Sequence, residues 1–343
     1  MTKYYFGRNN LALTIYAPYD CDNACPFCTS KTCYKRFNSS PSDVLYQIER
    51  VFRDYSYPIK DVVFTGGEPT ADVDILREML SRIPGYVNVY INTTMPKKNF
   101  EAFAKLAENS SQIRGINVSR HGATYEEDCQ DLNNICEDEF VHEFYVPIRI
   151  NCVIHEDEIV KILPVLDRWE PYREDVGVCF RADYCNIVSD EDLHNPYDPI
   201  AMALNEETFY NGHTQCNVCD TLMFRTANGL QVHYHRGLRR SSLIHEDGTY
   251  EINDLIIFPD GSLTYDWEYT SVKQMHEIEK QYEKPPLLFS RSPIIPAYVS
   301  CASASSCGIG RAGGSCGASG CGGPSGCGIG MVFRSCGPSG CGG

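Results

Sequence analysis

Short apolar runs alternate with amphipathic helix-like runs from residue 11 to about residue 185. The apolar runs are rich in β-branched and aromatic residues, which is typical of buried strands, and cover residues 11–16, 61–65, 87–91, 113–119, 144–154 and 175–180. Helical periodicity follows each of them, as in residues 44–52, capped by Ser42 or Asp43, and in residues 125–135. Six βα units in succession predict a parallel sheet. Periodicity alone leaves open whether the sheet curls into a barrel or lies flat.

Three cysteines follow the first strand-like run with the spacing Cys21-x3-Cys25-x2-Cys28. Three thiolates on one loop can hold three irons of a cubane cluster and leave the fourth iron open for a ligand, whereas four cysteines close such a cluster. A zinc knuckle or a chance cluster is the alternative interpretation, because Cys-x2-Cys is common in zinc sites.

A second motif, Gly66-Gly67-Glu68, comes directly after the strand-like run 61–65. Two glycines allow the backbone to approach a ligand closely, and a carboxylate can pair with an ammonium group. An ordinary tight turn is the alternative.

Together these motifs resemble the radical S-adenosylmethionine (radical SAM) superfamily, whose signature is Cys-x3-Cys-x-aromatic-Cys followed by a glycine-glycine-glutamate turn. Phe27 supplies the aromatic position before Cys28. The resemblance covers roughly residues 10–185 and implies an incomplete (β/α)6 TIM-type barrel. It also implies a [4Fe–4S] cluster on Cys21, Cys25 and Cys28, and SAM at the carboxyl ends of the strands, in contact with Phe27, Gly66, Gly67 and Glu68.

The resemblance further implies the reaction type. An electron from the cluster, delivered by a reductant protein of the flavodoxin or ferredoxin type, cleaves SAM. The 5′-deoxyadenosyl radical so formed abstracts hydrogen from the substrate. These motifs do not imply the substrate, because function belongs to the site and not to the fold.

Polar residues in or just after the apolar strands are candidates to line the barrel mouth; they are Asn92, Ser119, Arg120, His121, Arg149, Asn151 and Arg181. We assign Asn92, Ser119 and Arg149 to cofactor binding and leave the catalytic residues unassigned. For each of them, a solvated strand edge or a paired polar group in the core is the alternative.

Residues 205–284 have a different character and predict a small β-rich domain. Turn pairs at Asn228-Gly229, Asp247-Gly248 and Asp260-Gly261 separate short β-rich runs, which is typical of hairpins. The preceding residues 1–204 would form the radical SAM core.

Cys216-x2-Cys219 in this block resembles, more faintly, the C-terminal region of the radical SAM cyclases of molybdenum-cofactor biosynthesis. There a third cysteine follows after thirteen residues, and in this chain that position is His233. We therefore predict a metal held by Cys216, Cys219 and His233, either a second Fe–S cluster or zinc, with His235 as a further candidate. A simple hairpin is the alternative.

The last segment, residues 285–343, begins with a Pro-rich linker and continues as a Cys/Gly/Ser repeat without acidic residues after position 301. The pattern of residues 307–323 recurs at 327–343. Such a composition cannot bury a core, so it predicts a disordered tail.

Composition limits the classes of molecule that this protein is expected to bind. A net charge of −15 argues against nucleic-acid binding. The sequence has no apolar run long enough to span a membrane and its N-terminus lacks the apolar core of a signal peptide, so we expect a cytoplasmic location. Eighteen cysteines then fit metal ligation in a reducing compartment better than disulfides.

Three functions compete. The tail repeats look like tandem precursor-peptide cores, and several radical SAM families install thioether links at cysteines, which favours modification of a Cys-rich peptide. The faint similarity to the molybdenum-cofactor cyclases favours a purine nucleotide instead. A non-enzymatic metal-binding protein is the third hypothesis. It gives no reason for the glycine-glycine-glutamate turn, which would then occur by chance.

Overall fold

A computed structural model describes residues 4–6, 11–22, 25, 27–28, 31–129, 135, 140–182, 198–216, 219–235, 242–267, 272–282 and 284. The described residues belong to one compact unit. The predicted disorder of residues 285–343 lies outside the described part of the chain.

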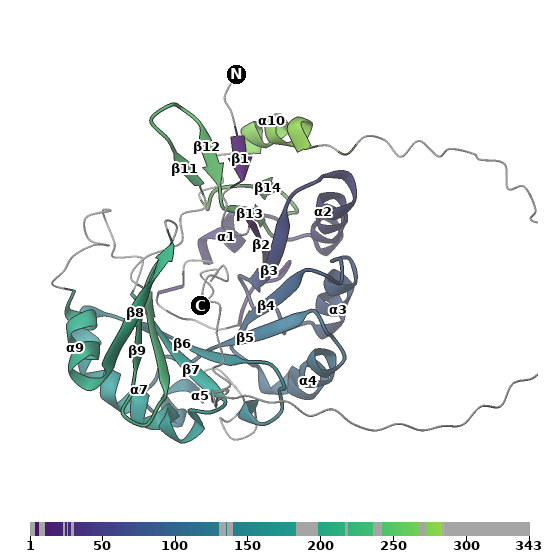
Figure 1. Ribbon diagram of the computed structural model, residues 1–343. Helices are drawn as coiled ribbons and strands as arrows, with labels where there is room; N and C mark the ends of the chain where they lie inside the picture. Colours follow the sequence, from purple (N-terminus) through teal and green to yellow (C-terminus); the bar gives the residue numbers. More distant parts are fainter. Residues whose placement is uncertain are drawn as a thin grey trace, which may run out of the picture. The chain divides into compact units, whose positions relative to one another are not determined.

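Six strands run parallel and pair in chain order, which confirms the predicted α/β class (Figure 1). They are β2 (Leu11–Tyr16), β3 (Ile59–Thr65), β4 (Asn88–Thr93), β5 (Ile113–Ser119), β6 (Ile148–Ile154) and β7 (Val176–Ala182). The sheet that contains them is open, with β14 and β8 at its edges. An open, mostly parallel sheet of this order is that of an incomplete barrel.

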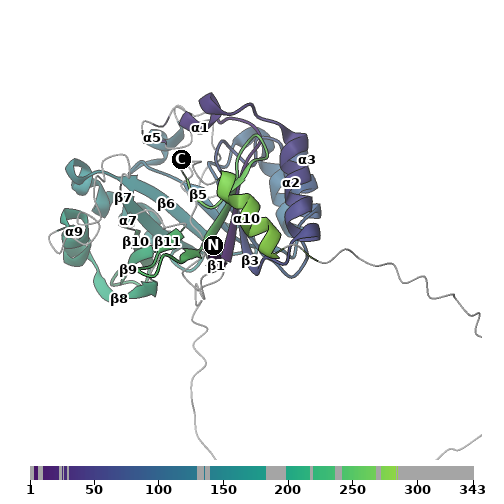
Figure 2. The same cartoon turned by 90° about the horizontal axis from the view of Figure 1, so that it is seen from above.

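Helices α2, α3 and α4 lie between successive strands in the chain and outside them in space, and α2 and α3 are side by side in two perpendicular views (Figures 1 and 2). The α-helices are α1 (Lys31–Arg36), α2 (Pro41–Asp54), α3 (Val73–Ser81), α4 (Phe100–Glu108), α5 (Tyr125–Cys129), α7 (Ile162–Trp169), α9 (Pro199–Glu207) and α10 (Val272–Tyr282). Short 3-10 turns are η1 (Lys97–Asn99), η2 (Glu156–Lys161) and η3 (Glu170–Tyr172).

Some element boundaries differ from the sequence prediction. The cap of α2 is Ser40, not Ser42 or Asp43, because Pro41 takes the first helical position, which suits its fixed φ. Strand β6 begins at Ile148, because Pro147 before it has no N–H to donate to a ladder. Helix α5 ends at Cys129, and residues 130–134 lie outside the described part.

Alternate residues of each strand point to opposite faces of the sheet. One face is apolar and packs against the helices; it includes Leu13, Phe64, Ile91, Val118, Ile150 and Val178. The other face, here called the inner face, is buried but largely polar; it includes Thr14, Asn92, Asn117, Ser119, Asn151 and Arg181. A buried polar face at the concave side of a parallel sheet is suited to hold a ligand.

Strands from residues 205–284 extend this sheet at both edges. Parallel pairing joins β10 to β7 and β13 to β2, and the three predicted hairpins are confirmed as the antiparallel pairs β9–β10, β11–β12 and β13–β14. One sheet contains strands from both sides of residue 205. The assignment of residues 205–284 to a separate domain stays a prediction. The strands are β8 (Phe209–Cys216), β9 (Cys219–Arg225), β10 (Gln231–His235), β11 (Ser242–Ile244), β12 (Tyr250–Ile252), β13 (Asp254–Ile257) and β14 (Leu263–Thr264), and β1 (Tyr4–Phe6) pairs with β12.

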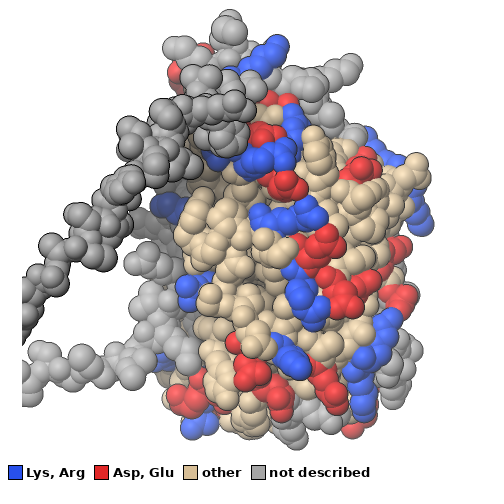
Figure 3. Space-filling model, turned by 90° about the vertical axis from the view of Figure 1, so that its right-hand side faces the viewer, with Lys and Arg blue, Asp and Glu red and all other residues tan. Residues whose placement is uncertain are grey.

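Positive and negative side chains are interspersed on the helical side of the molecule (Figure 3). Ion pairs such as Arg53–Glu49 within α2 and Arg82–Glu49 between α3 and α2 contribute to this mixture. The negative net charge therefore does not gather on this face. In the described residues, none of the helices combines the length and the apolar character needed to cross a bilayer.

Candidate active site

The cysteines of the first motif lie on the loop that follows β2, at the carboxyl end of the parallel strands. Cys21, Cys25 and Cys28 each carry a reduced, half-exposed thiol, and the Cys28 N–H donates to the Cys25 carbonyl at 3.3 Å. Three accessible thiols within eight residues are the donor set of a cluster with one open iron. The residues present therefore fit the [4Fe–4S] cluster that the sequence predicts.

The Gly66-Gly67 turn packs directly against the start of this cluster loop. Both glycines have positive φ, +63° and +54°. A Cβ on Gly66 would lie 2.0 Å from the ring of Tyr16, and one on Gly67 would lie 2.0 Å from the carbonyl oxygen of Tyr19. The two positions therefore need glycine for packing and conformation, and the predicted contact with SAM is a separate matter that stays a prediction.

Hydrogen bonds hold the base of the cluster loop on the turn. The Ala17 N–H donates to the Thr65 carbonyl at 2.8 Å, and the Tyr34 hydroxyl donates to the Ala17 carbonyl at 2.7 Å. The Tyr19 hydroxyl donates to the Pro69 carbonyl at 2.8 Å. Burial, reinforced by Asp72 and Glu68, raises the pKa of Tyr19 well above its ordinary value, so the phenol stays a donor.

Glu68 is buried, 3% exposed, and its carboxylate accepts five hydrogen bonds. Oε1 accepts from the Thr70 N–H (3.0 Å), the Thr70 hydroxyl (2.8 Å) and the Thr93 hydroxyl (2.6 Å). Oε2 accepts from the Thr94 N–H (2.6 Å) and the Thr94 hydroxyl (2.7 Å). A carboxylate has about four lone-pair positions. Glu68 thus clamps the turn after β3 to the end of β4, and an ammonium group would have to share oxygens that are already bonded.

Asn92 belongs to a second set of bonds on the inner face. Its Nδ2 donates to the Thr65 hydroxyl at 3.1 Å, and its Oδ1 accepts from Asn117 Nδ2 at 2.6 Å. Sequence reasoning missed Asn117, although a polar residue between Ile116 and Val118 in an apolar strand was an available signal. Its partner could not be read from the sequence.

Phe27 joins the cluster loop to the ends of β5 and β6. Its ring meets that of His121 edge-on, with centroids 4.5 Å apart. His121 Nδ1 accepts from the Val153 N–H at 3.0 Å, so the neutral ring carries its proton on Nε2. The sequence left His121 ambiguous; the structure puts it beside the residue that precedes Cys28.

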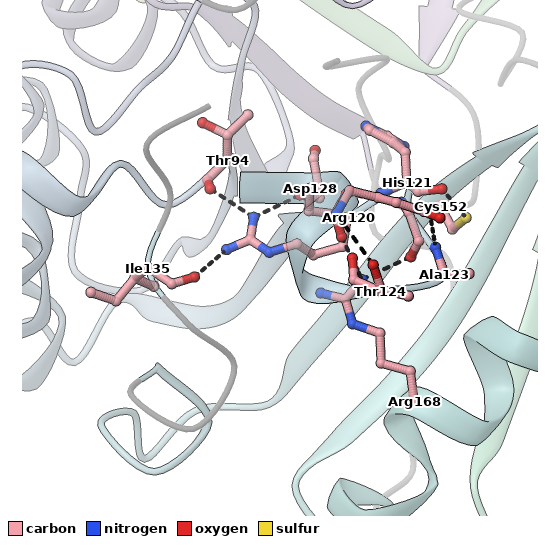
Figure 4. A network of polar contacts seen from close by, with 12 residues as sticks. Thr94, Arg120, His121, Ala123, Thr124, Asp128, Ile135, Cys152 and Arg168 are labelled. Atoms are coloured by element: carbon pink, nitrogen blue, oxygen red, sulfur yellow. Dashed lines mark hydrogen bonds and ion pairs between the residues drawn. The ribbon is translucent and has the colours of Figure 1, made fainter. Parts of the chain in front are cut away.

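A buried ion pair supports the segment that carries His121 (Figure 4). Asp128 and Arg168 are 2.5 Å apart, with side chains 4% and 8% exposed. Asp128 Oδ1 accepts from the His121 N–H at 2.7 Å and the Gly122 N–H at 2.9 Å. Arg168 also donates to the Gly122 and Thr124 carbonyls. The position of His121 is therefore set by bonds on both sides of it.

Arg120, a candidate for the barrel mouth, is buried and engaged with the backbone (Figure 4). Its guanidinium donates to the carbonyls of Thr94 (2.8 Å) and Ile135 (3.2 Å) and lies over the Phe140 ring. These contacts describe a structural arginine.

The inner face beyond β6 is cationic. It includes Arg149 on β6, Arg181 on β7, and His233 and His235 on β10. The residues next to them along each strand belong to the apolar core, so these four side chains point to the inner side. Burial and then Arg149 lower the pKa of His233 to about 4, and burial and then Arg181 lower the pKa of His235 well below its ordinary value. Both imidazoles are neutral at pH 7.

The predicted second metal site is only partly described. Cys216 and Cys219 pair across β8 and β9, and their side chains lie outside the described residues. Across β9 and β10, Thr221 is opposite His235 and Met223 is opposite His233. The backbone of His235 is thus nearer to Cys219 than that of His233. Ligation by Cys216, Cys219 and His233 stays a prediction.

Comparison with known protein families gives a match for part of the chain. Residues 15–141 match the model described as the Radical SAM superfamily. Among curated proteins, none matches the sequence. Two crystal structures of Streptococcus suis SuiB are similar to this chain, at 15% identity in the form bound to S-adenosylmethionine and 16% in the other. Both have a TM-score of 0.47 and cover 81% of this chain, which spans 64% and 66% of the SuiB chains.

Proposed function

We propose that this chain is a radical SAM enzyme that modifies a Cys-rich peptide, because its residues 15–141 match the model of the Radical SAM superfamily. The observation that carries the enzyme class is the position of three accessible thiols on a loop held against the Gly66-Gly67 turn, at the carboxyl ends of parallel strands. Ligands bind at this end of such sheets.

The family implies two cofactors, a [4Fe–4S] cluster and SAM. When bound, they supply radical chemistry that starts from the reductive cleavage of SAM. Cys21, Cys25 and Cys28 would hold the cluster. The Tyr16 and Tyr34 rings cover the base of the loop, and the clamp of Glu68 keeps the turn beside it rigid, so the site is preorganised on the protein side.

The tail supports a peptide substrate. Its cysteines recur at equal spacing among small residues in two copies, at 307–323 and 327–343. An enzyme that acts on equivalent sites in turn would meet such a pattern, and a tethered substrate has a high effective concentration at the active site. The faint similarity to molybdenum-cofactor cyclases supports a purine nucleotide as the second candidate.

The test is anaerobic reconstitution with iron and sulfide, followed by incubation with SAM and dithionite, with a flavodoxin as a second electron donor. We expect 5′-deoxyadenosine, and, after reduction and alkylation, a loss of about two hydrogens and one thiol per thioether in residues 301–343. Cys25→Ala should abolish both products, whereas Cys152→Ala, which alters a buried cysteine of the core, should keep them.

Two results would contradict the proposal. 5′-Deoxyadenosine formed by Cys25→Ala at the rate of the parent would remove the cluster assignment. A tail that stays fully alkylatable while 5′-deoxyadenosine accumulates would remove the tail as substrate and favour a separate molecule, with GTP the first to try.

We further propose that Cys216 and Cys219, with His233, hold a second Fe–S cluster or zinc, that the electron donor is a flavodoxin- or ferredoxin-type protein, and that the enzyme acts in the cytoplasm. For the metal, the double variant Cys216→Ser/Cys219→Ser should bind less iron or zinc than the parent. Equal metal content in the two proteins would reduce this segment to an ordinary hairpin.

A further inference from the structure

His235 lies on the inner face at the edge of the parallel strands. Its neighbour Tyr234 belongs to the apolar core, so the side chain of His235 points to the opposite, inner side of β10. In the parallel register of β7 and β10, Arg181 is directly opposite His235. Paired strands are about 4.8 Å apart, so the two side chains leave the sheet as immediate neighbours.

The ring of His235 is incompletely bonded. It is 8% exposed, and its Nδ1 is 2.8 Å from the Thr221 hydroxyl, which fixes the ring. Its Nε2 is buried and has no hydrogen-bond partner among the described residues. Buried polar atoms are nearly always bonded, and one that is not calls for an explanation such as a ligand.

Two described guanidinium groups place positive charge near this atom. Arg181 and Arg149 act on the His235 ring, and each of them disfavours a further positive charge there. A guanidinium offers a planar fork of donors that matches carboxylate and phosphate oxygens. A buried ring nitrogen beside such a fork is suited to an oxyanion.

We propose that Arg181 and His235 form a subsite on the inner face of β7 and β10 that binds an anionic oxygen group of the substrate, a carboxylate or a phosphate. The inference rests on the proposed function and deepens it, because it gives the substrate a charge. Thr221 holds the ring in place, and Arg181 supplies the permanent charge.

The test measures binding by calorimetry to the full-length, reconstituted protein. The probes are a peptide of residues 335–343 with a free carboxylate, the same peptide as its C-terminal amide, and GTP. We expect saturable binding of the free-acid peptide or of GTP, and the amide peptide separates a carboxylate source from other peptide contacts. Arg181→Met and His235→Gln should each raise the dissociation constant at least about tenfold. The control His245→Gln changes an exposed histidine in the turn between β11 and β12 and should bind like the parent.

Three outcomes would overturn the subsite. They are absence of saturable binding of both anionic probes to the parent, parental affinity in both Arg181→Met and His235→Gln, and loss of bound iron or zinc in His235→Gln with unchanged anion binding, which would make the histidine a metal ligand. SAM binding by the parent is measured in parallel. A parent protein that does not bind SAM would refute the proposed function. A parent that binds SAM but neither anionic probe would refute only the subsite.

Discussion

Two parts of the inner face, here called its first and second halves, differ in how the four polar side chains compared below are hydrogen-bonded. At the ends of β3, β4 and β5, the Glu68 carboxylate and the Asn92 amide are bonded within the protein. On β6, β7 and β10, Asn151 Oδ1 and His235 Nε2 are buried and lack a hydrogen-bond partner among the described residues. Burial is nearly the same for these four side chains, so the difference between them lies in their hydrogen-bond partners.

This difference separates a scaffold from a binding surface. A saturated polar network fixes geometry, because any movement would leave a buried group without its partner. Unsatisfied buried atoms carry a free-energy cost that a ligand can remove. We infer that the first half positions the cluster loop and that the second half receives the substrate.

The largest expected effect comes from Gly67→Ala in the first half. Its Cβ would lie 2.0 Å from the Tyr19 carbonyl at a φ of +54°, so the turn and the cluster loop must separate. We expect most of the reconstituted iron to be lost, as measured by iron content and visible absorption. Gly229→Ala is the matched control, since φ is +106° there but the space is open, and it should cost only about 1–2 kcal/mol. Full iron content in Gly67→Ala would show that the loop does not depend on the turn.

The second prediction concerns pH and the second half. His233 has a folded-state pKa lowered from its ordinary 6.5 to about 4, so the unfolded chain binds its proton first as the pH falls. The contribution of this residue to the free energy of unfolding is therefore fully present above pH 6.5. It decreases by roughly 3 kcal/mol as the pH falls from about 6.5 to 4. Chemical unfolding of the metal-free protein across this range should show the loss, and His233→Gln should flatten it. A His233→Gln curve parallel to that of the parent would contradict a neutral, partly buried imidazole.

The smallest expected effect is that of Glu68→Gln. The amide would turn one NH2 group toward donors that now bond a carboxylate oxygen, which should lower the free energy of unfolding by roughly 1–3 kcal/mol. Thermal unfolding without SAM measures this directly. Unchanged stability together with weaker SAM binding would instead assign the carboxylate to the ammonium group of SAM, and the first half would then be part of the ligand surface.

Elements that depend on local order were predictable. The six parallel strands follow from apolar runs, and the hairpins β9–β10, β11–β12 and β13–β14 follow from their Gly-containing turns. The boundaries of elements were less predictable. A proline next to Ser40 and another next to Ile148 set where α2 and β6 begin. Within the site, Phe27 was found as a motif residue, but its contact with His121 was not.

Cluster-forming spacing, the glycine turn and the βα order are properties of neighbours in the chain, so they could predict the enzyme class and the end of the sheet at which we propose the site. Which polar atoms are hydrogen-bonded depends on the tertiary structure. The donors to Glu68 include Thr93, the last residue of the next strand, and Thr94 just after it, and the ring of His235 is fixed by Thr221 across a hairpin. Such bonds follow strand register and burial, which no local pattern encodes, and they distinguish the hydrogen-bonded groups of Glu68 and Asn92 from the unbonded atoms of Asn151 and His235.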